Sequence, residues 1–254
     1  MADELKPQVY KDPRPPEQFQ PFHDWIRTHR PGWIYEMVRV ILTPIALILY
    51  RARAIGTPNV PADGGFILAP NHFSQMDHFF VGVYIRRKIQ FMAKSQLYGN
   101  PVLDYIFRIG GVFPVRRGHH DEEAFKTAYT VLGRGGCVGM YCEGGRSRTR
   151  ELGEPKPGVG RLALESGVPV VPVAIHGSLG VRRWKRLRFP KVTIQFGEQL
   201  NFARVERPDR AQQLEAAQRI FDSVKAMYTV LEAEGRKGAA ARFALPHERE
   251  HASG

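Results

Sequence analysis

His72 and Asp77 lie five positions apart in the segment NHFSQMD, residues 71–77. A histidine with one ring nitrogen held by a carboxylate can use its other nitrogen to remove a proton from a hydroxyl group. General-base catalysis of this kind contributes about 10²–10⁴-fold in rate. By itself the pair is a weak signal, because an aspartate near a helix start also serves as a cap.

The spacing of the two residues restricts where they can lie. On one regular helix they would be about 140° apart around the axis and could not meet. They can meet if a strand ends at Pro70, His72 lies in the turn and a helix begins near Ser74. Ser74 would then be the N-cap and Asp77 the N3 residue of a capping box. The spacing therefore predicts a strand–turn–helix junction in which Asp77 both caps the helix and orients His72.

Apolar runs and amphipathic runs alternate along the chain from residue 65. The predicted strands are 65–70, 89–93, 111–115, 137–142, 168–175 and 192–196. The predicted helices are 77–87, 99–109, 122–133, 158–166 and 210–234. This alternation predicts an α/β fold, a single domain with a mostly parallel central sheet flanked by helices. Pro169 and Pro172 indicate an edge strand or a bulge.

Composition divides the chain into four segments. Five prolines predict an extended arm over residues 1–22. Residues 23–54 form an apolar and amphipathic segment that we expect to associate with membranes. The main domain covers 55–234, and the tail 235–254, rich in Gly, Ala, Arg and His, is expected to be disordered.

The apolar segment 33–50 has two interpretations. Its uncharged part, 40–50, has only 11 residues, whereas a membrane-spanning helix needs about 20. Pro44 would bend it, and arginines flank it. A helix buried in the core and a helix seated at the lipid interface both fit this pattern.

The charge balance points to anionic partners. Lys and Arg number 37 against 25 Asp and Glu, a net charge of +12. Residues 182–191 carry six cations interleaved with Trp184 and Phe189. This run favours an anionic membrane surface over nucleic acid, because no zinc-finger, RNP or helix-turn-helix pattern accompanies it. We predict no nucleic-acid partner, and a peripheral or monotopic protein on the cytoplasmic face of the cell membrane.

Two cysteines, Cys137 and Cys142, are too few for a disulfide framework and indicate a reducing compartment. They have no second pair at zinc-ligand spacing, so core thiols are expected and no metal site is predicted. The chain contains neither a G-x-S-x-G nucleophile elbow nor a G-x-x-x-x-G-K-[ST] phosphate loop. A serine hydrolase and a nucleotide-driven enzyme are therefore disfavoured.

Four blocks occur in order: NHxxxxD at 71–77, GVFPVR at 111–116, EGGRS at 143–147 and VPVVPV at 168–173. Together they resemble the glycerolipid acyltransferase family, which includes the 1-acylglycerol-3-phosphate acyltransferases. The resemblance covers residues from about 55 to about 200. It implies transfer of a fatty acyl group from acyl-CoA or acyl carrier protein to a lysophospholipid acceptor, giving phosphatidic acid, with no cofactor. His72 would be the base, Asp77 would orient it, and no acyl-enzyme would form.

The resemblance also implies a set of substrate-binding residues: Asn71, Ser74, Phe113, Arg116, Glu143, Gly144, Gly145, Arg146, Lys156 and Pro172. Arg116 follows a predicted strand end and can grip a phosphate bidentately. The Gly144-Gly145 turn offers backbone N–H groups to an anion.

Two departures from the family pattern stand out. Gly145 replaces the usual threonine, and Arg116 is followed by a second arginine, Arg117. The first departure leaves the acceptor open: lysophosphatidic acid, another lysolipid or a glycolipid. A non-catalytic basic protein that binds membrane or nucleic acid is the remaining alternative, and the intact His72–Asp77 pair argues against it.

Overall fold

The computed structural model of the chain describes residues 11–119, 121–147, 149, 151–181 and 189–243. Most of the cationic run 182–191 therefore lies outside the described residues. The same holds for residues 1–10 of the arm and 244–254 of the tail.

A seven-stranded sheet forms the centre of the molecule, in the order β1-β7-β6-β2-β5-β3-β4. The strands are β1 (Arg53–Ile55), β2 (Phe66–Pro70), β3 (Ile89–Lys94), β4 (Phe113–Val115), β5 (Cys137–Gly139), β6 (Val170–His176) and β7 (Thr193–Phe196). Every neighbouring pair is parallel except β6 and β7, which are antiparallel. The predicted α/β fold with a mostly parallel sheet is confirmed.

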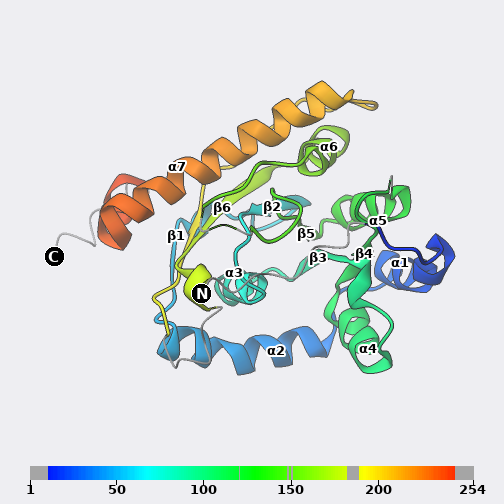
Figure 1. Ribbon diagram of the computed structural model, residues 1–254, viewed down its shortest axis with the longest axis horizontal. Coiled ribbons are helices and arrows are strands. Elements are labelled where there is room, and N and C mark those ends of the chain that lie inside the picture. The colour runs from blue at the N-terminus through cyan, green and yellow to red at the C-terminus, as the bar shows by residue number, and fades with distance from the viewer. Residues whose placement is uncertain (1–10, 120, 148, 150, 182–188, 244–254) are drawn as a thin grey trace.

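Helices connect and cover the strands (Figure 1). The α-helices are α1 (Gln20–Thr28), α2 (Trp33–Pro44), α3 (Asp77–Tyr84), α4 (Pro101–Gly110), α5 (Glu122–Gly133), α6 (Pro157–Ser166) and α7 (Arg210–Phe243). Short helical turns are η1 (Pro16–Phe19), η2 (Ile45–Leu49), η3 (Thr57–Asn59) and η4 (Ser95–Leu97).

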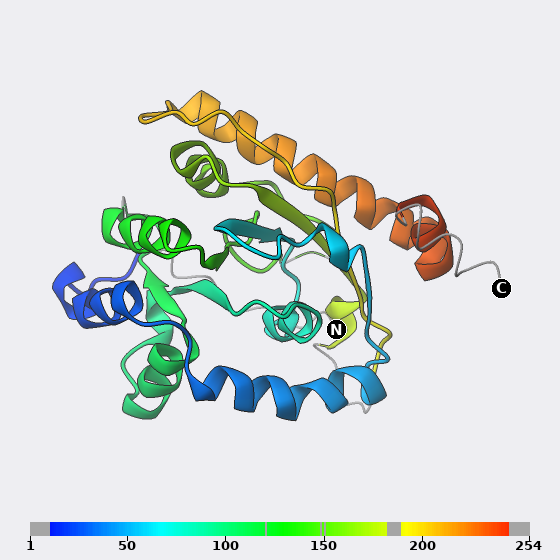
Figure 2. The same cartoon turned by 180° about the vertical axis from the view of Figure 1, so that it is seen from behind.

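The sheet is buried on both faces, which explains why its strands read as continuous apolar runs. Residues of α1, α5, α6 and α7 pack with one face, where Ile67, Val138 and Ala174 point. Residues of α3 and η2 pack with the other face, where Leu68 and Val173 point. Figures 1 and 2 show α6 and α7 on one side of the sheet and α2 on the other.

β6 corrects one of the two expectations raised by its prolines. The strand is not at an edge, because β2 and β7 flank it. A bulge is present instead. Val170 pairs with Leu200 and Val173 with Phe196, so two residues of β6 oppose three residues of the partner segment. The irregularity falls at Pro172, which has no N–H to donate to a regular ladder.

The two ends of the chain are more helical than predicted. Within the expected arm 1–22, η1 begins at Pro16 and α1 at Gln20, because prolines fit the first turn of a helix. Within the expected disordered tail, 235–243 continue α7 after a break at Gly235, whose φ of 66° suits glycine. The strand β1 was not predicted, since three residues carry too short a pattern.

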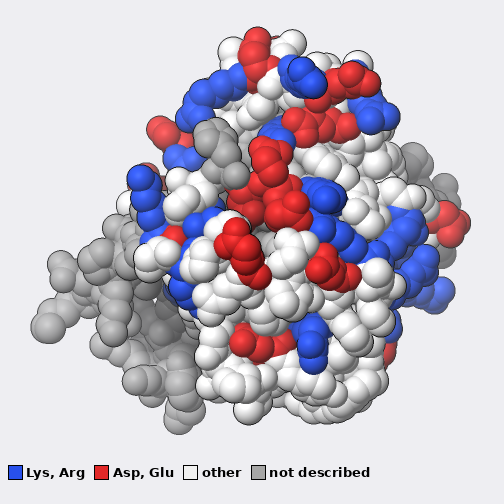
Figure 3. Space-filling model, turned by 90° about the vertical axis from the view of Figure 1, so that its right-hand side faces the viewer, with Lys and Arg blue, Asp and Glu red and all other residues white. Residues whose placement is uncertain are grey.

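Apolar side chains remain exposed on α2 and α4. On α2, Trp33, Met37, Val40 and Ile41 follow the i, i+4, i+7, i+8 spacing of a single helical face and are 62%, 42%, 70% and 55% exposed. Val102 and Tyr105 are exposed on α4. Figure 3 shows that charges gather over the upper part of the face it presents, while the lower part, on the side of α4 in Figure 1, is mostly uncharged.

Among the described residues, no single helix has the length and apolar composition to cross a bilayer. The stretches Pro16–Thr28 and Trp33–Leu49, bent by 85° relative to each other, meet that requirement only as a pair.

Candidate active site

His72 and Asp77 meet at the end of β2, as the spacing predicted. His72 Nδ1 lies 2.9 Å from Asp77 Oδ2. The Asp77 side chain is fully buried, whereas 12% of the His72 side chain is exposed. With the Nδ1 proton directed to the carboxylate, Nε2 keeps its lone pair for a substrate hydroxyl.

Asp77 does more than orient the imidazole. Its Oδ2 atom also accepts the backbone N–H groups of Phe73 and Ser74, each at 2.7 Å. Ser74 Oγ in turn accepts the N–H of Met76 at 3.2 Å. One of the two hydrogen bonds of the expected capping box is therefore present, the one from the Ser74 N–H to the Asp77 side chain. The helix begins at Asp77 and not near Ser74. The carboxylate fixes the turn in front of the helix because three donors converge on one oxygen.

The loop after β5 holds the backbone of His72 from both sides. Glu143 Oε1 accepts the His72 N–H at 2.8 Å, and the Ser147 N–H donates to the His72 carbonyl at 2.8 Å. Glu143 Oε2 accepts the N–H of Gly153, also at 2.8 Å. Burial raises the pKa of Glu143, while these two N–H donors oppose the shift. Both carboxylate oxygens are thus engaged within the protein, and Glu143 positions the site.

Asn71 has a similar internal role. Its side-chain amide donates to the Ile175 carbonyl at 3.1 Å, and its side-chain oxygen accepts the Ile175 N–H at 2.7 Å. Asn71 is fully buried. Asn71 bonds the segment after β2 to β6, just beyond the last residue pair of these two strands, and so positions the neighbouring His72.

The His72 ring is packed against an aromatic side chain, and its burial favours the neutral form. It stacks on Tyr141, with ring centroids 3.7 Å apart and planes 16° apart. Burial lowers the pKa of His72; the Asp77 carboxylate raises it, and Arg146 and Arg117 lower it further. A neutral imidazole is the form that a general base needs.

Two arginines lie within electrostatic range of this ring. Arg146 and Arg117 both lower the pKa of His72. The pKa of Lys94 is lowered mainly by burial and further by the same two arginines. Lys94 ends β3, Arg117 follows β4, and Arg146 lies in the loop after β5. The three strands run parallel to β2, on the side where β5 pairs with it, so their carboxyl ends lie at the same edge of the sheet, as expected for a site in an α/β sheet.

Arg117 and Lys94 were not among the predicted site residues, and the structure adds them as candidates. The second arginine after β4 was visible in the sequence, but the predicted phosphate-binding residue was Arg116. The backbone N–H of Arg116 donates to Asp121 at 2.6 Å. Tyr141 was also missed, because its packing against His72 depends on the return of the chain in β5.

The remaining predicted substrate-binding residues lie in different surroundings, some in the loop after β5 and some in the core. Gly144 has a φ of 65°, and the Lys156 side chain packs against it. Gly145 is buried within the same loop. Phe113 is fully buried and meets His23 of α1 edge-on, on the core side. Pro172 is buried in β6 near Met227 of α7. The structure therefore brings Gly144 and Lys156 together and leaves Phe113 in the core.

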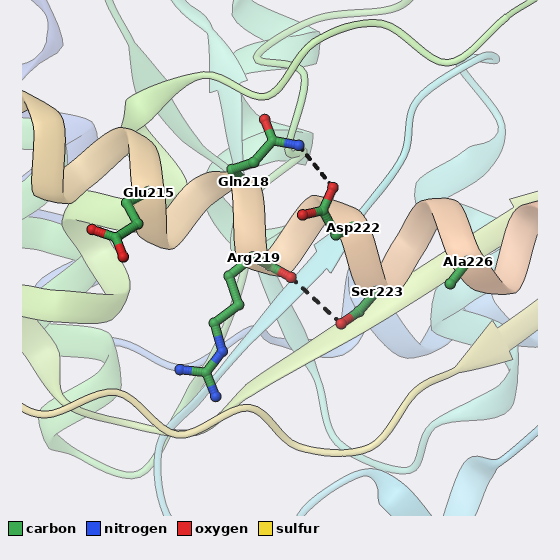
Figure 4. Close-up of a pocket in the computed structure, with 6 residues that line it drawn as sticks. All are labelled: Glu215, Gln218, Arg219, Asp222, Ser223 and Ala226. Carbon is green, nitrogen blue, oxygen red and sulfur yellow. Dashed lines mark hydrogen bonds between the residues drawn. The ribbon is translucent and has the colours of Figure 1, made fainter.

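Other features of the described residues provide no second candidate active site. Within the described residues, no three His, Cys, Asp or Glu side chains lie close enough to hold a metal ion. A shallow hollow on the outer face of α7 is lined by residues of that helix alone, and Gln218 bonds Asp222 there (Figure 4). Cys137 and Cys142 are buried and unpaired, as predicted.

Comparison with known proteins agrees with this geometry. Residues 51–176 match the Acyltransferase family. The chain is 31% identical over 154 residues to the 1-acyl-sn-glycerol-3-phosphate acyltransferase of Bacillus subtilis, covering 60% of the chain and 76% of that protein. It is 27% identical to the chloroplastic 1-acyl-sn-glycerol-3-phosphate acyltransferase BAT2 of Brassica napus, covering 51% of the chain and 38% of that protein.

A solved structure shares the fold. It is the 1-acyl-sn-glycerophosphate (LPA) acyltransferase PlsC of Thermotoga maritima, with a TM-score of 0.62 and 22% identity. The match covers 86% of this chain and 90% of that one. The resemblance seen in the four sequence blocks is confirmed, and the chain belongs to the acyltransferase family.

Proposed function

We propose that the protein transfers a fatty acyl group from an acyl thioester to the hydroxyl of 1-acyl-glycerol-3-phosphate, giving phosphatidic acid for phospholipid biosynthesis. One observation carries the proposal: His72, bonded to Asp77 at 2.9 Å, lies within the electrostatic reach of Arg117 and Arg146. A base for a hydroxyl and cations for a phosphate are the two requirements of this acceptor. The identity of the relatives supports the same acceptor.

In the proposed reaction the acceptor hydroxyl attacks the carbonyl carbon of the thioester. His72 Nε2 takes the hydroxyl proton as the new C–O bond forms. The C–S bond then breaks, and the leaving sulfur receives that proton from His72. The imidazolium formed between these steps is stabilised by the buried Asp77 carboxylate. No covalent acyl-enzyme is required.

The phosphate of the acceptor would bind the cations at the carboxyl ends of the strands. Arg117, Arg146 and Lys94 supply the charge, and an arginine can bind two phosphate oxygens at once. Arg116 and Lys156 are further candidates on neighbouring loops. Acyl-CoA or acyl carrier protein would supply the acyl group.

Both lipids of this reaction reside in or next to a bilayer, and the exposed apolar face of α2 suits such a location. We place the protein on the cytoplasmic face of the cell membrane, peripheral or monotopic, with an anionic lipid surface as its partner. Apolar side chains on α2 would insert at the headgroup boundary, flanked by arginines.

A second acceptor is favoured by one residue. Gly145 lacks the hydroxyl of the threonine usual in the family, so the loop offers one polar contact fewer to the head group. A different lysolipid or a glycolipid would then be acylated by the same chemistry.

The test is an acyl-transfer assay with labelled acyl-CoA and acyl carrier protein against lysophosphatidic acid, other lysophospholipids and a glycolipid. Lysophosphatidic acid should give the highest kcat/KM. Preference for a neutral acceptor by at least tenfold would overturn the proposed acceptor while keeping the reaction. Gly145→Thr is the matched variant, and it should sharpen the preference for lysophosphatidic acid if the missing hydroxyl matters.

A further inference from the structure

A second group of cations lies at the edge of the sheet, apart from His72. Arg53 begins β1 and pairs with Thr193 of β7, which pairs with His176 of β6. β6 is the neighbour of β2, so Arg53 lies at the same end of the sheet as the candidate active site. Three strand spacings separate β1 from β2, roughly 14 Å.

A hollow of about 500 Å³ opens beside these residues. Its walls combine basic, hydroxyl and apolar groups from four elements: Leu47 of η2, Arg51, Arg53 of β1, Thr57 of η3 and Tyr84 of α3. Leu47 is 45% exposed and belongs to the apolar stretch that begins in α2. The hollow therefore lies at the margin of the surface that we assign to the membrane.

Among the described residues, no carboxylate pairs with the arginines near the hollow, which are Arg51, Arg53 and Arg236. The Arg51 guanidinium donates to the Phe189 carbonyl, and Arg236 donates to Thr193 Oγ1 and to the Val192 carbonyl. Burial lowers the pKa of Arg236, and Arg53 and Arg51 lower it further. Mutual repulsion of this kind is relieved when an anion binds between the cations.

Two local features also lack a structural explanation. The Tyr84 hydroxyl is buried and has no hydrogen-bond partner among the described residues, although buried polar groups are usually bonded. Arg51 has a φ of 42°, which is uncommon for a residue with a side chain. Strain of this kind is often retained where a ligand is bound. A phosphate in the hollow would accept a hydrogen bond from the Tyr84 hydroxyl and pair with the arginines.

We propose that this hollow binds the phosphate group of an organic phosphate, separately from the acceptor bound at His72. Two sources share this chemistry: the head group of an anionic phospholipid in the bilayer, and a phosphate of the CoA portion of a soluble thioester. Both sources are ligands of the proposed function, so the choice between them rests on that function, whereas phosphate binding in the hollow is measured without acyl transfer.

The test compares Arg51→Gln/Arg53→Gln and Tyr84→Phe with wild type in two binding assays. The first uses phosphatidylcholine vesicles containing phosphatidylglycerol, and the second uses coenzyme A in solution. The double variant should lose about 25-fold in affinity for one of these ligands, at about fivefold per arginine. Tyr84→Phe should lose about threefold for the same ligand, because it removes only a hydrogen-bond donor.

The matched control is Arg210→Gln, which removes an exposed arginine at the start of α7. It should change either affinity by less than about twofold. Weaker vesicle binding with unchanged coenzyme A binding identifies the lipid head group, and the reverse identifies the thioester. The proposal fails if folded variants bind both ligands as wild type does, or if Arg210→Gln loses as much affinity as the double variant. Folding is verified by circular dichroism, and His72→Ala should bind both ligands as wild type does.

Discussion

The β2–α3 junction and the outer face of α2 differ in which side chains they bury and which they expose. At the junction, Asp77 is fully buried and receives three donors on one oxygen, and Glu143 uses both of its oxygens on backbone N–H groups. On α2 and the turn η2 that follows it, Val40 and Ile48 belong to an exposed apolar surface, with 70% and 72% of their areas exposed. One region fixes polar groups away from water, and the other leaves apolar groups in contact with it.

The difference matches the roles that we propose for the two regions, a general base at the junction and a lipid-binding surface on α2. A general base must keep its geometry, so its neighbours are tied to the backbone. A surface that receives lipid must gain free energy when a bilayer covers it, and exposed apolar side chains provide that gain. Separate substitutions should therefore abolish the chemistry and the membrane binding independently of each other.

The largest effect is expected for His72→Ala. Removing the base should lower kcat by about 10³-fold, within the range typical of general-base catalysis. Binding to vesicles should not change, because the exposed apolar surface lies elsewhere. Acyl-transfer kinetics and a vesicle sedimentation assay on the same preparation measure both. A folded variant that keeps most of its activity would disprove the mechanism.

The converse variant combines Val40→Gln, Ile41→Gln and Ile48→Gln on the exposed apolar surface. Each exposed aliphatic group would contribute about 1 kcal/mol on partial insertion, so vesicle affinity should fall about 10²-fold. Activity towards a short-chain acceptor dissolved in water should stay near that of wild type. Leu214→Gln is the control, since Leu214 is 46% exposed on α7. Equal losses in the control would contradict a specific role for α2.

A smaller effect is expected when the support of His72 is weakened. Glu143→Gln leaves one side-chain oxygen for two backbone donors, so one N–H is left without its acceptor. The free energy of unfolding should fall by about 1–2 kcal/mol, and kcat should fall about tenfold. Denaturant unfolding and steady-state kinetics measure the two quantities. Glu151→Gln, in an exposed loop position, should alter neither.

The smallest effect concerns pH. The kcat/KM of the wild type should fall on acidification, because protonation removes the free Nε2 lone pair. Burial holds the pKa of His72 below its usual range, and Arg146 lowers it further, so activity extends to lower pH. Arg146→Gln removes one lowering charge and should move the acidic limb of the profile to higher pH. The arginine has no such influence if the limb stays in place or moves to lower pH.

Much of the junction followed from the spacing of residues 71–77, because two side chains five positions apart can meet only across a change of backbone conformation. The predicted helix 77–87 begins where α3 does, at Asp77, but the position of the cap did not follow. The prediction assumed that Ser74 caps the first turn, whereas the Asp77 carboxylate collects the N–H groups of Phe73 and Ser74 before the helix begins. A capping motif in sequence does not specify which residue is the first in the helix.

The proline-containing strand was predicted only in part. Pro172 signalled an irregular strand, and a bulge is present, yet β6 lies inside the sheet. Strand order depends on pairings between segments far apart in the chain, which local pattern does not report. For the same reason the tail beyond Gly235 looked disordered, although Arg236 returns to bond Thr193 of β7.

The amino-acid sequence by itself determined the fold class, the His72–Asp77 pair, the net positive charge of the chain and the apolar composition of its N-terminal segment. These depend on periodicity, spacing and charge, which are properties of neighbouring residues. Only the tertiary structure decided that Tyr141 stacks on His72, that Glu143 holds its backbone, and that Arg117 joins Arg146 beside it. Such contacts form where parallel strands end side by side, and their partners are tens of residues apart in the chain.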